Sequence, residues 1–274
     1  PIPPLRDLVG LLQLFFLFGI FVIMAAGVGA LTAQLFGIST LWGSAVFCLA
    51  ASWLSLTGTS GMMRVFSAVV PPLVICSVAV SALTLHRCGW QFIVTAAPSG
   101  SPLLGSWAAA ACFFVSYNLF SSVGILAPVG RSLRSPRTVW QGIFLGCVML
   151  FSIALGIFLT MQAVPAATAQ PLPMLSVAGA LGRGWYGVYA LLLFAAMFGT
   201  ALSCAVALRH YCAVRFPRLT VRSGVFVLLL AILSWGCSLF GFGELIGTVY
   251  PVCGALGASA MLGLLHHRIT LTRP

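Results

Sequence analysis

The sequence predicts an all-α membrane protein with eight transmembrane helices, and three observations lead to this prediction. The first is composition: 61% of the 274 residues are hydrophobic and 5% are charged, whereas a soluble domain carries about 25% charged residues. The second is a series of eight apolar runs, each close to the roughly 17–25 residues that cross a bilayer as a helix. The third is that all 13 basic residues are arginines, placed almost entirely between these runs. We therefore expect one transmembrane domain over residues 1–274 and no soluble domain.

The apolar runs define the expected helices in order. They lie near Leu11–Leu35, Thr40–Leu56, Val65–Leu85, Trp107–Val129, Val139–Gln162, Trp185–Cys212, Gly224–Gly241 and Leu245–Leu265. A further apolar segment, Met174–Leu181, is too short to span and lies between Pro-rich and Gly-rich flanks. We expect this segment to form a short helix over one face of the bundle.

The arginines predict the orientation of the chain. If the amino end is cytoplasmic, 11 of the 13 arginines fall in cytoplasmic segments, and Arg87 and Arg183 fall outside. Cytoplasmic loops of membrane proteins carry such an excess of basic residues. An error of one span would mix the two sets, so we expect both termini of this chain to be cytoplasmic. The net charge of +11 is then an orientation signal, and no nucleic acid partner is expected.

The fourth run, Trp107–Gly130, is apolar but has polar side chains at its centre. These are Ser116, Tyr117, Asn118, Ser121 and Ser122. Ser and Asn side chains can compete with the backbone hydrogen bonds of a helix, and backbone groups freed in a membrane must be buried in protein or face a cavity. One interpretation is a helix broken near Asn118 that faces an internal site. The alternative is an intact helix whose polar side chains bond to neighbouring helices.

Prolines indicate an internal repeat. The third run contains Pro71-Pro72 and the eighth contains Pro251 at the corresponding place, 180 residues after Pro71. A shift of this size also places the first two runs over the sixth and seventh. Repeat partners then have opposite orientation, which is typical of the inverted repeats of secondary transporters. The fourth run has no partner in this chain, and Pro1 is not an initiator methionine, so we expect truncation at the amino terminus.

Three stretches resemble a known family. They are Met24-Ala-Ala-Gly-Val-Gly-Ala30, Val115-Ser-Tyr-Asn118 continuing through Val123 to Gly130, and Leu245-Ile-Gly-Thr-Val-Tyr-Pro251. Their order and spacing resemble the YkvI family of bacterial membrane proteins, within the amino acid–polyamine–organocation superfamily and its leucine-transporter fold. The resemblance aligns this chain with the third to tenth of the ten core helices of that fold. The chain departs from the pattern because the first two core helices are absent, and the first supplies half of the substrate and ion site.

The resemblance implies a secondary active transporter of a small organic solute, amino-acid-like or similar, in the bacterial cytoplasmic membrane. The residues expected to bind the solute are Ser116, Tyr117, Asn118, Ser121 and Ser122 in the fourth run, with Gly27 and Gly29 in the first. Backbone groups at the break and the Asn118 amide would contact the solute, and Tyr117 would gate it or stack on it. Close packing of helices explains Gly27 and Gly29 equally well.

The resemblance also implies a sodium site at Thr200 and Ser203, which lie three residues apart on one helix face. The alternative is that both hydroxyls bond to carbonyls of their own helix. The two acids, Asp7 and Glu244, lie at span ends, and Glu244 suits a helix amino terminus. Because no Asp, Glu or Lys lies mid-span, where a proton-coupling group would be expected, we expect sodium coupling and no other cofactor.

Other functional classes are less well supported by the sequence. An intramembrane enzyme would need an acid–base pair, a metal motif such as HExxH or a nucleophile elbow, and none is present, so we expect no enzymatic activity. The nine cysteines form no CxxC and no Cys/His cluster, and we interpret them as small buried hydrophobes. A non-transporting receptor or scaffold subunit with a transporter fold predicts the same spans and remains an alternative. The sequence indicates neither the solute nor the oligomeric state.

Overall fold

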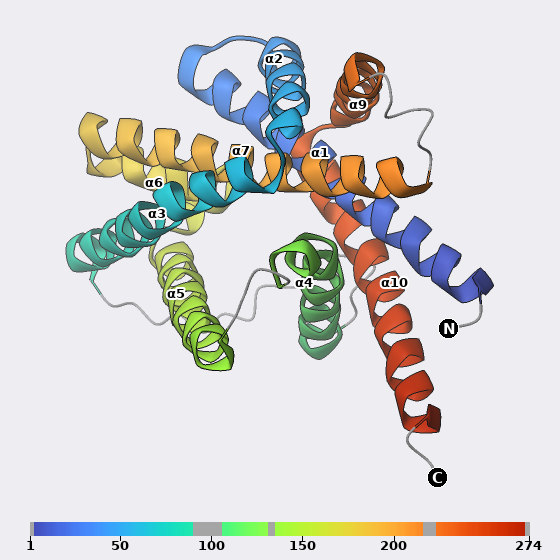
Figure 1. Cartoon of the computed structure of the whole chain (residues 1–274). Helices are drawn as coiled ribbons and strands as arrows, with labels where there is room; N and C mark the ends of the chain where they lie inside the picture. The colour runs from blue at the N-terminus through green and yellow to red at the C-terminus, as the bar shows by residue number, and fades with distance from the viewer. Residues whose placement is uncertain (1–2, 90–105, 131–134, 216–222, 272–274) are drawn as a thin grey trace.

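The computed structural model describes residues 3–89, 106–130, 135–215 and 223–271, and this part of the chain is built from helices (Figure 1). The α-helices are α1 (Pro3–Phe36), α2 (Thr40–Leu54), α3 (Gly58–Cys88), α4 (Trp107–Gly130), α5 (Pro136–Ala163), α6 (Pro173–Leu181), α7 (Arg183–Arg215), α9 (Ser223–Ser238) and α10 (Phe242–Leu271). Two short 3₁₀ helices, Ser55–Thr57 and Pro165–Ala169, follow α2 and α5. The short helix expected at Met174–Leu181 is α6.

The long helices identify a membrane protein. Within the described residues, six helices are long and apolar enough to cross a membrane. They are α1, α2 with its 3₁₀ extension, α3, α5, α7 and α10. The two other expected spans correspond to α4 and α9, whose described apolar stretches, Ala108–Val123 and Gly224–Ser238, are shorter. Each expected span is therefore a helix, and six of them meet the length and composition needed to cross.

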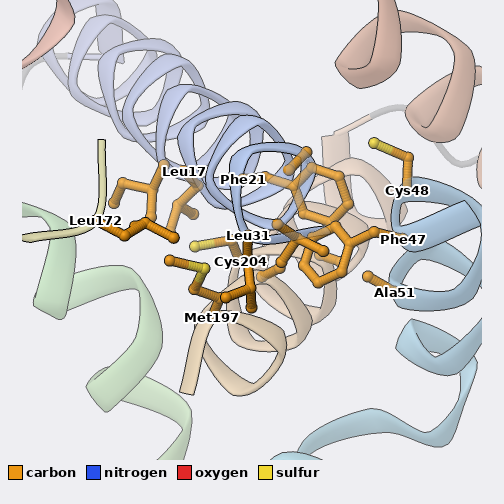
Figure 2. Packing of buried hydrophobic residues seen from close by; sticks show 14 of the residues in the cluster. Leu17, Phe21, Leu31, Phe47, Cys48, Ala51, Leu172, Met197 and Cys204 are labelled. Atoms are coloured by element: carbon orange, nitrogen blue, oxygen red, sulfur yellow. The ribbon is translucent and has the colours of Figure 1, made fainter. Parts of the chain in front are cut away.

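The centre of the bundle is the antiparallel pair α1 and α7, which cross in Figure 1. At one end, Nη2 of Arg215 in α7 lies 2.8 Å from Oδ2 of Asp7 in α1. At the other end, the Tyr186 hydroxyl of α7 donates to the Gln34 carbonyl of α1 at 3.1 Å. Buried side chains form the core around this pair, and Figure 2 labels members from α1, α2 and α7 together with Leu172, which precedes α6.

Several of the described arginines lie at or near helix ends. Nη1 of Arg209, in the last two turns of α7, donates to the Ser55 carbonyl at 3.3 Å, so the end of α2 lies at the same side as the end of α7. Arg87, by contrast, lies at the end of α3, and Arg183 begins α7. Several arginines of the larger set lie outside the described residues, namely Arg131, Arg134, Arg218, Arg222 and Arg273.

Helix packing follows an approximate two-fold pattern. Two pairs, α1 with α7 and α2 with α9, each consist of two helices that are partners in this pattern. The other contacts occur as equivalent pairs: α3 packs on α7 and its counterpart α10 packs on α1. Likewise, α2 packs on α7 and its counterpart α9 packs on α1. Exchanging α1 with α7, α2 with α9 and α3 with α10 leaves these pairs unchanged. The pattern is approximate because α1 also packs on α2, with no α7–α9 contact of comparable extent in the described residues. These exchange partners are the ones that the 180-residue shift relates.

Helix α4 is continuous from Trp107 to Gly130, so the predicted break near Asn118 is wrong. Nδ2 of Asn118 donates to the Phe114 carbonyl at 2.8 Å. The hydroxyls of Ser121 and Ser122 donate to the carbonyls of Asn118 and Leu119 at 3.0 and 2.8 Å. These side chains therefore bond to accessible carbonyls of their own helix, a pattern compatible with an unbroken helix.

Candidate functional site

The polar residues of α4 are divided between its two faces. Tyr117 and Ser121 are buried, Ser116 and Ser122 are half-buried, and Asn118 is exposed. From α1, Nε2 of Gln13 donates to the Ser121 carbonyl at 3.2 Å. Of the five α4 residues expected to bind a solute, only Tyr117 and Ser121 are thus buried in the bundle.

Close contact with α10 occupies another part of α4. A Cβ atom at Gly254 of α10 would lie 2.5 Å from Cβ of Phe113, and one at Gly257 would lie 3.0 Å from the Ser116 carbonyl oxygen. Small residues allow helix backbones to approach in this way. The Ser116 carbonyl therefore faces the backbone of α10, with no room between them for a solute.

The structure does not bring Gly27 and Gly29 to α4. A Cβ at Gly27 would lie 3.0 Å from the ring of Phe242, and one at Gly29 would lie 2.8 Å from the Thr40 carbonyl oxygen. The ring of Phe16 in α1 stacks with that of Tyr117 in α4. Gly27 lies about 16 Å of helix rise beyond Phe16, so it is far from this contact with α4. Both glycines allow close helix packing, which is the alternative that the sequence left open.

Thr200 and Ser203 each bond to a carbonyl of α7. The Thr200 hydroxyl donates to the Ala196 carbonyl at 3.0 Å, and the buried Ser203 hydroxyl donates to the Gly199 carbonyl at 2.8 Å. Each hydroxyl oxygen keeps lone pairs that can accept a further bond. The arrangement matches the alternative interpretation of these residues, in which both hydroxyls bond to carbonyls of their own helix.

Four helices instead meet at a cluster that the sequence did not single out, which we call the tyrosine cluster. It contains Phe16 of α1, Tyr117 of α4, Cys204 of α7, and Tyr250 and Cys253 of α10. The ring centroids of Tyr117 and Tyr250 are 4.7 Å apart, and their hydroxyl groups interact. Cys204 and Cys253 are buried and belong to the same core cluster as Tyr117, with Tyr250 packed against it.

A groove lies between α4 and α10, beside the tyrosine cluster. This α4–α10 groove has a volume of about 490 Å³. Its lining is Ala110, Ala111, Phe113, Phe114, Tyr117, Ile246, Gly247, Tyr250 and Pro251. No charged side chain is among these residues, and the two tyrosine hydroxyls are its polar side-chain groups. The groove therefore suits a largely apolar molecule with one or a few hydrogen-bonding groups.

Pro251 adds a backbone acceptor to this groove. Proline has no N–H, so the carbonyl four residues earlier loses its usual helical donor. That carbonyl belongs to Gly247, which lines the groove. A carbonyl freed inside a membrane needs another partner, so Gly247 can accept a hydrogen bond from a bound molecule.

Prolines also leave carbonyls without their helical donors in α3. Pro71 and Pro72 lie inside this helix and free the carbonyls of Ser67 and Ala68. Ser67 and Ala68 line a shallow hollow of about 530 Å³ together with Met63 and Arg64. Ser67 is related to Gly247 by the same shift of 180 residues, so each repeat partner carries a freed carbonyl at a depression.

The residues that sequence reasoning missed had one local signal. Tyr250 immediately precedes Pro251. Its hydroxyl therefore belongs to the part of α10 where proline removes a backbone hydrogen bond. Phe16, Cys204 and Cys253 had no such signal, because a buried Phe or Cys within an apolar helix is ordinary packing.

Together, the fold and this site define a multi-pass α-helical membrane protein with a groove at a proline-containing helix. No protein-family model matches the chain, and no solved structure matches it. The chain is similar to two Bacillus subtilis (strain 168) proteins. "Uncharacterized membrane protein YkvI" is 24% identical over 262 residues, which cover 94% of this chain and 73% of the relative. "Uncharacterized protein YyaD" is 26% identical over an alignment of 288 residues including gaps, which covers 97% of this chain and 76% of the relative. These distant relationships support a YkvI-like family.

Proposed function

We propose that the protein is a secondary active transporter of a small organic solute. The observation that carries this proposal is the exchange pattern of the helices, in which α3 and α10 are partners and both contain proline within the helix. Inverted repeats with interrupted helices are typical of secondary transporters, whose solute sites lie at the interface between the repeats. The leucine-transporter architecture suggested by the family resemblance is part of this proposal.

The α4–α10 groove is the proposed solute site. Tyr117 and Tyr250 offer hydroxyl groups, and Gly247 offers a carbonyl that Pro251 leaves without its helical donor. The apolar lining would hold the body of the solute. Among the solute-binding residues expected from the sequence, Tyr117 has this role, while Ser121 is buried behind it against α1.

Sodium is the proposed coupling ion. The hydroxyl oxygens of Thr200 and Ser203 donate to their own helix but retain lone pairs, and Ser203 precedes Cys204 of the tyrosine cluster. We place the protein in a bacterial cytoplasmic membrane with the arginine-rich side in the cytoplasm, following the usual excess of basic residues there.

Uptake into proteoliposomes tests this function. The purified protein is reconstituted and offered a panel of labelled neutral amino acids, amines and small aromatic alcohols under an inward sodium gradient. At least one solute should accumulate above its outside concentration, and the Thr200→Ala, Ser203→Ala double variant should lose most sodium dependence. Absence of accumulation across the panel under both sodium and proton gradients would contradict transport, whereas sodium-independent uptake driven by pH would contradict only the coupling ion.

A further inference from the structure

A second groove lies between α3 and α5 and has a volume of about 440 Å³. We call it the α3–α5 groove. Its apolar lining includes Val78, Ala82 and Leu85 of α3 and Leu155 and Leu159 of α5. It is separate from the α4–α10 groove, since the two share no lining residue.

The α5 side of this groove is apolar and exposed within the described residues. None of the most apolar window of α5 is buried within the described residues, and Phe151 and Phe158 on the same helix are 68% and 57% exposed. A helix that is apolar on its exposed sides contacts lipid. An acyl chain of a membrane lipid matches this apolar, exposed lining.

A buried hydroxyl lies in the seam of the α3–α5 groove. Ser81 is 2% exposed, and its Oγ has no hydrogen-bond partner among the described residues. A Cβ at Gly156 of α5 would lie 2.9 Å from this Oγ, so the hydroxyl points across the seam towards α5. Both residues line the groove. Buried polar groups in proteins are nearly always bonded, so the Ser81 hydroxyl calls for an acceptor within the groove.

One end of the α3–α5 groove lies beside basic side chains at the end of α3. Between Val78 and His86 the groove extends for about 12 Å of helix rise, which fits within one leaflet of a hydrocarbon core about 30 Å thick. His86 lines its end, and the exposed Arg87 follows in the last turn of α3. Arg87 is one of two arginines on the arginine-poor side of the protein, and an anionic headgroup would complement its charge.

We propose that the α3–α5 groove binds one anionic phospholipid. An acyl chain lies along the apolar lining, an ester carbonyl accepts the hydrogen bond of the Ser81 hydroxyl, and the phosphate lies at His86 and Arg87. A free phosphate would use only the last of these contacts. The lining therefore selects a lipid over a soluble phosphate ester.

Native mass spectrometry of the protein in detergent tests the site with three separate probes: phosphatidylglycerol, phosphatidylethanolamine and glycerol 3-phosphate. One phosphatidylglycerol should bind, in preference to both other probes. Arg87→Ala removes a charged contact and Ala82→Phe fills the groove, so each should lower the bound fraction about tenfold. Ser81→Ala, which removes one neutral hydrogen bond, should lower it about fivefold.

Matched controls separate the site from general effects. Arg183→Ala removes the other arginine of the same side, and Ala255→Phe enlarges an exposed alanine on α10; both should bind phosphatidylglycerol as the parent does. A melting temperature equal to that of the parent shows that each variant is folded. Equal binding of all three probes, or equal binding by the groove variants and their controls, would overturn the proposal. Because these readouts need no solute, they are independent of transport.

Discussion

At the scale of single residues, Tyr117 and Tyr250 are the groups that distinguish this bundle from plain apolar packing. Their rings lie 4.7 Å apart at the boundary between the core and the α4–α10 groove. A buried tyrosine usually directs its hydroxyl to a partner, and here the two hydroxyls interact with each other. A solute with a hydrogen-bonding group can replace that interaction without leaving a hydroxyl unpaired.

The first prediction concerns Tyr250. Replacing it by Phe keeps the ring and removes the hydroxyl, so transport efficiency for the best solute of the uptake panel should fall about tenfold. Tyr211→Phe is the matched control, because Tyr211 lies near Gly10 at the arginine-rich end of α7. Initial uptake rates over a range of solute concentrations measure both. Equal rates for the two variants would remove Tyr250 from the site.

The second prediction concerns the contact of α4 with α10. Gly254→Ala would bring a methyl group to 2.5 Å from Cβ of Phe113, which should destabilise the protein by about 1–3 kcal/mol. Gly263→Ala on the same helix adds a methyl group in open space and should be neutral or slightly stabilising. Thermal unfolding in detergent compares the two variants. A Gly254→Ala protein as stable as the Gly263→Ala protein would contradict the observed packing.

At the scale of elements, α4 shows where local sequence reasoning reaches its limit. Asn118, Ser121 and Ser122 were correctly recognised as groups that compete for backbone hydrogen bonds. Their type does not decide whether they break the helix or bond to its own carbonyls, and in the structure they do the latter. The same ambiguity applied to Gly27, where only the neighbouring Phe242 and Met197 show that the residue serves close packing.

The third prediction tests the continuity of α4. Backbone amides of residues 116–122 should exchange slowly with deuterium in nanodiscs, since each has a helical acceptor within α4. The middle of α1 provides the reference for a continuous, buried helix. Fast exchange confined to Ser116–Ser122 would show that the helix opens there and would restore the predicted break.

The fourth prediction concerns Pro251 in α10. Alanine at this position restores a donor to the Gly247 carbonyl, so Pro251→Ala should stabilise the helix by about 1 kcal/mol while lowering solute uptake. Pro173→Ala is a control, because Pro173 occupies the first turn of α6, where a missing N–H costs little. Melting temperature and uptake are measured together. Unchanged uptake with raised stability would confine Pro251 to a structural role.

At the scale of the whole molecule, composition and the apolar runs were sufficient to predict an all-helical membrane protein. The positions of the helices follow from apolar runs and their polar boundaries, and the contacts of Arg209 and Arg215 agree with the sidedness of the arginines. The site could not be obtained in the same way. It depends on which faces of α1, α4, α7 and α10 meet, and an almost uniformly apolar sequence carries little information about helix faces.

The fifth prediction concerns orientation. In a variant without its nine native cysteines, a cysteine placed at residue 133 or 219 should resist an impermeant thiol reagent on intact cells, and one placed at residue 97 should react. Permeabilised cells provide the control, in which all three should react. Labelling of the first two but not the third on intact cells would reverse the proposed topology.

The central claim is that solute binds in the α4–α10 groove, and solute protection tests it most directly. Ala111 lines this groove, so a cysteine at that position in the cysteine-free variant reports on its occupancy. Val46→Cys, on the exposed face of α2, serves as the control. A solute accumulated in the uptake assay should slow thiol labelling at position 111, with half-protection near its transport KM, and leave position 46 unchanged. Labelling at position 111 that is unaffected by saturating solute would contradict the claim.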